Sequence, residues 1–270
     1  ITILLFCAVY ISTYAQDTTY NYDSRGYRET GKLNAKKQRT GEWNSYLTNG
    51  KLFRTEFYED GEKTGEQKSY YENGQLDTYE KYEKGKLTGE WKHYSEKGKL
   101  LKLVNFQNGE QIGEYKTFHE NGQPMQSGFY EIGGATGEWK EYNIRGQLTD
   151  IRIFENHIVT KRTYYHPGGQ VSHIEDYKNG EFTAYFVTGE IRETGKLKNY
   201  ARHGEYKIYL INGTLNGTSN YENGNLTGIR RYYHENGKVM QEGKYKNGAK
   251  VGTWKSYDEN GKLTDTIKFD

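Results

Sequence analysis

The chain repeats itself with a period of 24 residues over almost its whole length. Repeat copies begin at residues 17, 41, 65, 89 and 113, and then at 137, 160, 180, 204, 228 and 252. The tenth residue of every copy is glycine, and asparagine precedes it in six of the eleven copies. Because both residues tolerate positive φ, Asn-Gly between short aromatic runs is a strong hairpin signal. A period of this size indicates an array of stacked supersecondary units.

The copy at 89–112, GEWKHYSEKGKLLKLVNFQNGEQI, shows what lies between the turns. Its third, sixth and eighteenth residues are the aromatic Trp91, Tyr94 and Phe106. Turns recur every 11 to 13 residues, the segments between them are rich in β-forming residues, and the whole chain has two prolines. We therefore predict an all-β fold: an elongated single-layer antiparallel meander of repeated β-hairpins, with about two strands in each 24-residue copy.

The type of turn decides which aromatic side chains share a face of this sheet. A two-residue Asn-Gly turn places Trp91 on the side of Leu100 and Phe106. A type I turn followed by a glycine bulge shifts the register by one residue and places Tyr94 there instead. The sequence leaves both arrangements open. In either case both faces carry rings, which fits a sheet covered by its own aromatic and lysine side chains.

The composition excludes several classes of protein. Hydrophobic residues make up 33% of the chain, but 27 tyrosines argue against disorder. The net charge of +2 comes from 38 basic and 36 acidic residues spread along the whole chain, so no nucleic-acid partner is expected. The sequence has no nucleophile elbow, P-loop, zincin motif or calcium loop. We therefore predict a protein that is not an enzyme and uses no cofactor or metal.

The first fifteen residues stand outside the repeat. Ile1 to Ile11 is an apolar run of the length of a signal-peptide core, and residues 13–15, Thr-Tyr-Ala, resemble a cleavage site. The run is shorter than the roughly 20 residues of a membrane span. We predict a signal peptide at 1–15, truncated at its start, and export to the periplasm, the cell surface or the medium. A buried N-terminal strand is the alternative. The single cysteine, Cys7, lies here, so the mature chain is expected to have no disulfide.

Two stretches depart from the repeat. Residues 16–40 have Asn34 in place of an aromatic residue, and we interpret them as a degenerate N-terminal capping repeat over the sheet edge. Tandem repeats then fill 41–270, with an irregular stretch at 157–203. Here the copy that begins at residue 160 has lost four residues, and Tyr200 replaces a turn glycine. This stretch is either a bend with a tolerated deletion or a partner-specific patch.

The motif Gly-Glu-Trp-Lys-x-Tyr-x-x-x-Gly-Lys-Leu at Gly89–Leu100, followed by Tyr/Phe-x-Asn-Gly, resembles the MORN repeat. It is most similar to the bacterial variant found in tandem in antitoxin-like proteins, and the resemblance spans roughly 17–270. It implies a twisted single sheet of successive hairpins. It also implies roles in protein–protein contact, in scaffolding and, in some eukaryotic members, in association with membrane lipid. The antitoxin-like members imply a protein that neutralises a toxin by binding it.

Together these features predict an exported, non-enzymatic repeat scaffold that binds another protein along an extended sheet face. The alternatives are a module that binds cell-envelope glycan or lipid through the same rings, and an antitoxin- or immunity-type protein. The sequence does not indicate an oligomeric state. The structural alternative for each ring is a cross-strand ladder, in which a pair contributes about 0.2 to 1 kcal/mol. The candidate partner-binding residues are aromatic or basic: Trp43, Trp91, Trp139, Lys161, Arg162, Tyr164, Tyr165, His166, Tyr200 and Trp254.

Overall fold

The structure, a computed structural model, describes the backbone of residues 16–21 and 27–270 and the side chains from Tyr27 onward. The predicted signal peptide at 1–15, with Cys7, lies outside the described residues. In the described part all regular secondary structure is β, as predicted, and no helix there is long and apolar enough to cross a membrane. The chain forms two compact units, one ending at Gly122 and the other beginning at Gln123.

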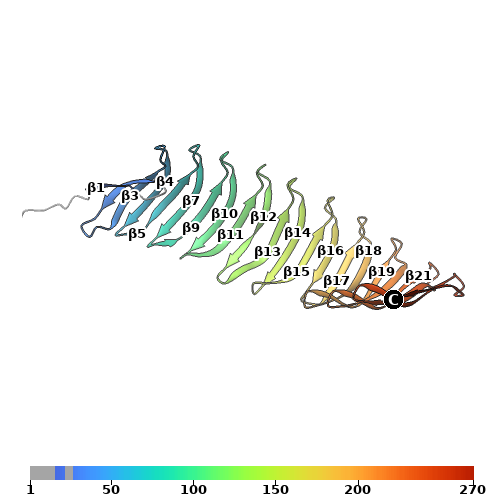
Figure 1. The fold of residues 1–270 in the computed structure, drawn as a ribbon. Coiled ribbons are helices and arrows are strands. Elements are labelled where there is room, and N and C mark those ends of the chain that lie inside the picture. Colours follow the sequence, from blue (N-terminus) through green and yellow to red (C-terminus); the bar gives the residue numbers. More distant parts are fainter. Residues whose placement is uncertain (1–15, 22–26) are drawn as a thin grey trace, which may run out of the picture. The chain divides into compact units, whose positions relative to one another are not determined.

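Unit 1 is an antiparallel meander in which each hairpin pairs with the next one along the chain (Figure 1). Residues 16–40, the predicted cap, supply its first two strands, so this copy extends the sheet. The strands are β1 (Gln16–Asn21), β2 (Arg28–Leu33), β3 (Arg39–Tyr46), β4 (Leu52–Glu59), β5 (Glu62–Lys63), β6 (Gly65–Tyr70), β7 (Leu76–Glu83), β8 (Lys86–Leu87), β9 (Gly89–Tyr94), β10 (Leu100–Gln107) and β11 (Glu110–Phe118).

Unit 2 has the same architecture, and each of its strands pairs antiparallel with the next. The predicted meander of hairpins, with about two strands per copy, is therefore confirmed in both units. The strands of unit 2 are β12 (Pro124–Glu131), β13 (Gly134–Tyr142), β14 (Leu148–Glu155), β15 (Ile158–Tyr165), β16 (Val171–Asp176), β17 (Glu181–Tyr185), β18 (Ile191–Lys198), β19 (Ala201–Tyr209), β20 (Leu215–Glu222), β21 (Asn225–Tyr233), β22 (Val239–Lys246), β23 (Ala249–Tyr257) and β24 (Leu263–Phe269).

Two kinds of turn alternate along each meander. The first kind contains the tenth-position glycine: the Gly98 N–H donates to the Ser95 carbonyl, and the Ser95 N–H donates to the Lys99 carbonyl, both at 2.8 Å. The second kind has two residues with positive φ, such as Asn108 (53°) and Gly109 (87°). Successive turns lie at opposite ends of the strands. We call the two rows the first-turn edge and the second-turn edge.

The geometry of the first turn decides which side chains share a face. Tyr94 pairs with Leu100 across a bulge, as the glycine-bulge alternative predicts. The eighteenth-position ring, by contrast, lies with the third-position tryptophan: the ring centroids of Trp139 and Phe154 are 5.9 Å apart. Each alternative was therefore right for one ring, because the bulge changes the register within the strand. We call the side that carries the third-position rings the tryptophan face.

Indole rings on the tryptophan face cover glycines of the preceding strand. A Cβ atom at any of these glycines would lie 2.1 or 2.2 Å from a ring carbon, so only glycine fits beneath the ring. The covered ring is nearly inaccessible, with 1% of the Trp43 surface exposed. Each ring thus replaces the missing glycine side chain and forms a small core on one face of the sheet. The pairs are Gly31 with Trp43, Gly128 with Trp139, and Gly243 with Trp254.

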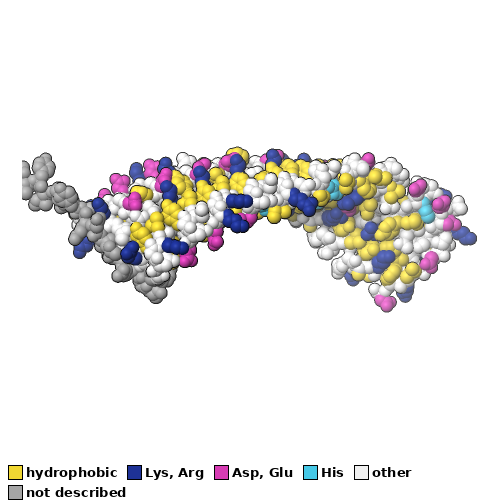
Figure 2. Space-filling view, turned by 90° about the horizontal axis from the view of Figure 1, so that it is seen from above, with side chains coloured by type: hydrophobic (Ala, Val, Ile, Leu, Met, Phe, Trp, Pro, Cys, Tyr) yellow, Lys and Arg dark blue, Asp and Glu magenta, His cyan; other side chains and the backbone are white. Residues whose placement is uncertain are grey.

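Charged side chains lie between the rows of rings. Figure 2 shows this on one face, where rows of hydrophobic side chains have Lys, Arg, Asp and Glu beside them. On the tryptophan face of unit 2 the carboxylate of Asp150, 5% exposed, accepts a hydrogen bond from Arg152 Nε at 2.8 Å and from Arg162 Nε at 2.5 Å. The buried charge is therefore paired with two cations, as burial requires.

Side chains at the ninth and eleventh repeat positions tie neighbouring first turns together. The Asn73 amide donates to the Glu96 carbonyl at 2.8 Å, and the Asn236 amide donates to the Glu259 carbonyl at 2.9 Å. Lys238, at the eleventh position, reaches the next turn in the same way at 3.3 Å. Each accepting carbonyl belongs to the next first turn in the sequence, about one repeat period after the donor. We call these bonds turn straps.

Candidate functional site

The copy that lost four residues forms a short hairpin in unit 2. β16 and β17 have six and five residues, whereas β15 and β18 on either side have eight. The turn between β16 and β17 comes early, and the N–H groups of Tyr177 and Lys178 both donate to the Thr160 carbonyl, at 2.9 and 3.1 Å. β15 and β18 therefore project beyond this hairpin, and the second-turn edge is indented here.

The indentation is a cavity of about 380 Å³, which we call the Tyr200 notch. The β14–β15 turn and the β18–β19 turn contribute residues from its two sides, and the early turn of the short hairpin contributes residues between them. The notch thus combines residues from three successive hairpins. Its lining residues are Glu155, Asn156, Ile158, Val159, Thr160, Tyr177, Lys178, Asn199 and Tyr200.

Tyr200 has an unusual backbone conformation for its residue type. It and Asn199 form a two-residue second turn with φ values of 63° and 51°. The equivalent second residue is glycine in regular copies, at Gly61, Gly85, Gly109, Gly224 and Gly248, and it is His157, with a φ of 64°, in the copy that begins at residue 137. A left-handed conformation costs a residue with a Cβ roughly 1–2 kcal/mol. Tyr200 nevertheless holds it with 60% of its surface exposed, and strain of this kind is typical of functional positions.

Tyr177 supports the Tyr200 ring. The two ring centroids are 4.6 Å apart, at an interplanar angle of 56°. The Tyr177 hydroxyl donates to Glu175 at 2.5 Å. Burial, together with this carboxylate, raises the pKa of Tyr177 well above its usual range, so the ring stays neutral. In this aromatic pair, the Tyr177 ring is held by its hydrogen bond and the Tyr200 ring is exposed.

The charges of the notch are paired with each other. Lys178 Nζ lies 2.7 Å from a carboxylate oxygen of Glu155, and both side chains are about half exposed or more. The hydrogen bond to Glu155 raises the pKa of Lys178 above its usual value. Asn156 and Asn199 add amide groups beside this pair. The notch is an apolar and aromatic surface with a neutral polar rim, a composition that suits binding.

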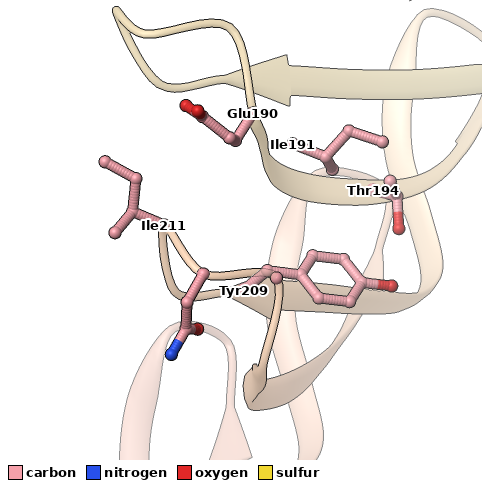
Figure 3. Close-up of a pocket in the computed structure, with 7 residues that line it drawn as sticks. Glu190, Ile191, Thr194, Tyr209 and Ile211 are labelled. Atoms are coloured by element: carbon pink, nitrogen blue, oxygen red, sulfur yellow. The ribbon is translucent and has the colours of Figure 1, made fainter.

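A second cavity opens at the first-turn edge of unit 2, between the β17–β18 and β19–β20 turns. Its volume is about 580 Å³, and we call it the Ile211 pocket. In Figure 3 the Tyr209 ring lies next to Ile191, and its hydroxyl end is nearest to Thr194. Ile211 and Glu190 lie toward the opposite end of the ring. The pocket is lined by Glu190, Ile191, Thr194, Tyr209, Ile211, Asn212 and Gly213.

The sequence profile of the MORN repeat variant matches six segments of the chain: 39–60, 63–84, 87–108, 111–131, 226–247 and 250–270. The chain belongs to the MORN-repeat family. MORN repeats are associated with binding to proteins and membranes. The matched segments leave out residues 132–225, the stretch that contains both cavities. The two cavities therefore lie where this MORN-repeat protein departs from its own family pattern.

No curated protein matches the chain in sequence. Among solved structures it is similar to part of a GtfA/B complex bound to UDP and GlcNAc, with 17% identity over 41% of this chain and 23% of that chain, at a TM-score of 0.21. It is also similar to part of TcdB2-TccC3, with 13% identity over 88% of this chain and 15% of that chain, at a TM-score of 0.20. The MORN-repeat chain thus spans less than a quarter of either solved chain.

Three of the predicted partner-binding tryptophans are not at the surface. Trp43, Trp139 and Trp254 are 1%, 5% and 2% exposed, because each covers a glycine on the neighbouring strand. The prediction that their rings contact a partner is therefore wrong. Trp91 has Glu80, not glycine, on the preceding strand. It is only partly buried and donates from Nε1 to that carboxylate at 3.1 Å.

Five further predicted residues lie on or just after β15, away from the notch lining. Arg162 bonds Asp150, and the Tyr164 ring stacks on His173 at 4.0 Å, so both belong to the network on the tryptophan face. Lys161 is exposed, while Tyr165 and His166 are half-buried near the first-turn edge. Of the ten predicted residues, Tyr200 alone lines the notch.

The sequence prediction missed the residues that complete the two cavities. Tyr177 and Lys178 join the notch because the deletion shortens their own hairpin. The Ile211 pocket has a signal that the sequence does carry. At the eighth repeat position Ile211 replaces the glutamate of other copies, such as Glu235 and Glu259. Among the residues described, no group of three His, Cys, Asp or Glu side chains could hold a metal ion.

Proposed function

We propose that this chain is an exported, non-enzymatic MORN-repeat scaffold that binds another protein at the Tyr200 notch. One observation carries the proposal: an exposed tyrosine keeps a left-handed turn conformation over a cavity, at a turn position that is glycine in the regular copies. Glycine adopts this conformation without strain. His157 has the same conformation but does not line the notch, whereas Tyr200 adds an exposed ring to it.

The chemistry of the notch suits a protein partner. Tyrosine is enriched among residues that dominate interface energies, because its ring offers a large area with little conformational entropy to lose. The Tyr200 ring is partly fixed by Tyr177, and Ile158 adds exposed apolar area beside it. The Lys178–Glu155 pair lies at the rim, where charges contribute to specificity more than to affinity.

The proposed absence of catalysis rests on the same geometry. Glu155 and Lys178 neutralise each other and are both exposed, so neither has the separate environment that an acid or a base of a catalytic pair requires. The regular copies contribute avidity or length, not chemistry.

Export is part of the proposal and has a direct test. A reporter enzyme fused after residues 1–20 should leave the cytosol of the producing cell, because the apolar run at its start has the length of a signal-peptide core. Retention of the reporter in the cytosol would overturn the export proposal. It would favour the antitoxin-like role, in which the partner is a toxin inside the cell.

One observation favours a second function, binding of cell-envelope glycan. The exposed ring of Tyr200 lies near the amides of Asn156 and Asn199, and sugars are recognised by aromatic faces beside polar groups. Such a ligand would use the same notch. Recovery of insoluble wall material, with no stoichiometric protein, would support this alternative in place of protein binding.

The proposed function is tested by partner capture from envelope extract with immobilised wild-type protein and two variants. Tyr200→Gly restores the residue that other copies have and should reduce capture of one stoichiometric protein by about tenfold or more. Ile229→Ala removes an exposed apolar side chain elsewhere in unit 2 and should leave capture unchanged. Equal capture by wild type and Tyr200→Gly would overturn the proposal.

A further inference from the structure

We propose that the Ile211 pocket binds a protein segment that presents an aliphatic side chain beside a lysine or an arginine. The inference rests on the proposed protein-binding function and assigns a second contact on the opposite, first-turn edge of unit 2. Three features of the pocket support this contact: the loss of a turn strap, the apolar lining that this loss leaves, and one carboxylate at the rim.

The pocket exists because a turn strap has been replaced. Six copies have asparagine at the ninth position and several have lysine at the eleventh, and these side chains can bond the next turn, as Asn236 and Lys238 do. In the β17–β18 turn the same positions are Thr188 and Glu190, and the Thr188 hydroxyl donates to the Glu190 carboxylate within the turn. The side chains that would reach across to the next turn are therefore absent from these two positions.

The walls of the pocket are apolar and open to solvent. Ile211 is 56% exposed, and Ile191 is 45% exposed on the facing turn. The Tyr209 ring completes this apolar lining (Figure 3). A cavity of about 580 Å³ exceeds the volume of one branched aliphatic side chain, so such a side chain can enter with its flanking backbone. Burial of a leucine-sized side chain supplies the main attraction.

The rim determines which aliphatic segment fits best. Among the seven lining residues the charged one is Glu190, and its side chain is exposed to solvent. The Thr188 hydroxyl and the Glu190 backbone N–H lower the pKa of this carboxyl, so it is ionised at neutral pH. It attracts a cation next to the aliphatic anchor and repels an acidic neighbour. A fatty acid, which carries its own carboxylate, fits less well for the same reason.

The chain provides an internal control for the pocket. Ile144 occupies the same eighth repeat position as Ile211 and is also exposed, at 62%, on a first turn of unit 2. Ile144 does not line the Ile211 pocket. If the pocket binds a ligand, the methyl signal of Ile211 responds and that of Ile144 does not.

The test is a titration of the full chain, labelled at the isoleucine methyl groups, followed by NMR. The probe is the tetrapeptide Ser-Leu-Lys-Ser, capped at both ends. The methyl signals of Ile191 and Ile211 should shift to saturation, with Ile144 unchanged. The matched peptide with Ala in place of Leu should bind about tenfold more weakly. The peptide with Glu in place of Lys should bind about two- to fivefold more weakly.

Two variants separate the pocket from a loss of folding. Ile211→Glu introduces the residue of regular copies and should abolish the Ile191 shift while the far-ultraviolet circular dichroism stays that of the wild type. Glu190→Gln should bind the Lys and Glu peptides equally. Equal binding of both peptides by the wild type, or an equal shift at Ile144, would overturn the inference.

The outcome is independent of partner capture at the notch. Tyr200→Gly should leave the Ile211 shift unchanged, because Tyr200 lies on the second-turn edge and does not line the pocket. If the proposed function is wrong, Tyr200→Gly captures the partner as well as the wild type does. If this inference is wrong, the wild type binds the Lys peptide and the Glu peptide equally well.

Discussion

The Tyr200 ring lies 4.6 Å from the Tyr177 ring, measured between centroids, and the two residues lie in different turns, with β17 and β18 between them in the sequence. Tyr177 is in the turn that the deletion shortened, and Tyr200 is in the next turn on the same edge. The deletion therefore does more than remove residues. It sets the β16–β17 turn back from the second-turn edge, so that the Tyr200 ring of the following turn can contact Tyr177.

Variants of Tyr200 should separate backbone strain from ring contact. Tyr200→Gly relieves a left-handed conformation that costs roughly 1–2 kcal/mol and loses a ring contact of about 0.5–1.5 kcal/mol. Its free energy of unfolding should therefore stay within about 1 kcal/mol of the wild type. Tyr200→Ala loses the ring but keeps the strain, so it should be less stable than Tyr200→Gly by about 1 kcal/mol. Urea denaturation measures both, and an alanine variant as stable as the glycine variant would show that no strain exists.

The glycine beneath a buried indole should not tolerate a methyl group. In Gly243→Ala the new Cβ would lie 2.1 Å from the Trp254 ring, so the ring must move. The expected loss of stability is about 1–3 kcal/mol. Gly168→Ala is the matched control, because its near neighbour is the flexible end of Gln170, and its effect should be about 0.5 kcal/mol or less. Equal urea midpoints for the two variants would contradict the packing described for Trp254.

The buried carboxylate of Asp150 should contribute more than surface ion pairs. Asp150→Asn leaves Arg152 and Arg162 with a weaker acceptor, and the expected loss is about 1.5–3 kcal/mol. Glu138→Gln removes a half-exposed partner of Lys140, with an expected loss below about 1 kcal/mol. Added salt should reduce the second loss more than the first, because exposed pairs are screened. Unfolding at low and high salt tests both statements.

Glu56 should make unit 1 sensitive to acid. Burial alone raises the pKa of Glu56, but Lys63, 2.8 Å away, and Arg54 outweigh this, and the pKa lies below its usual value. A carboxyl with a lowered folded-state pKa stabilises the fold above its unfolded-state pKa, and this contribution is lost as the pH falls through the folded-state value. The free energy of unfolding should therefore decrease from about pH 5 downward, and less steeply in Glu56→Gln. Parallel pH profiles for the two proteins would rule out this role.

The fold was predictable because the turns are local. Gly98 and Gly109 have φ values of 74° and 87°, which a side chain rarely permits, so each glycine specifies a turn through its own sequence. The fates of the tryptophans were harder to predict, because burial depends on the neighbouring strand. Trp254 is buried over Gly243, whereas Trp91 faces Glu80 and stays partly accessible. A glycine eleven or twelve residues before the ring is the signal that distinguishes them.

The candidate site was predictable only in part. Tyr200 stands out in the sequence because it replaces a turn glycine, and the structure places it in a cavity. Tyr177 does not stand out, because it occupies an ordinary aromatic position of the repeat. Its role depends on where the deletion places its turn relative to two neighbouring hairpins. The repeat pattern in the sequence does not show where the shortened turn lies relative to those hairpins.

Site-specific photocrosslinking at three equivalent turn positions tests protein binding at the Tyr200 notch most directly. Asn199, Asn223 and Asn247 are each the first residue of a second turn, with φ values of 51°, 49° and 50°. A benzophenone side chain is introduced at each position in turn, and the protein is irradiated in the cells that produce it. Protein binding at the notch predicts one crosslinked protein from position 199 and none from positions 223 and 247. Equal crosslinking at all three positions, or none at 199, would contradict it.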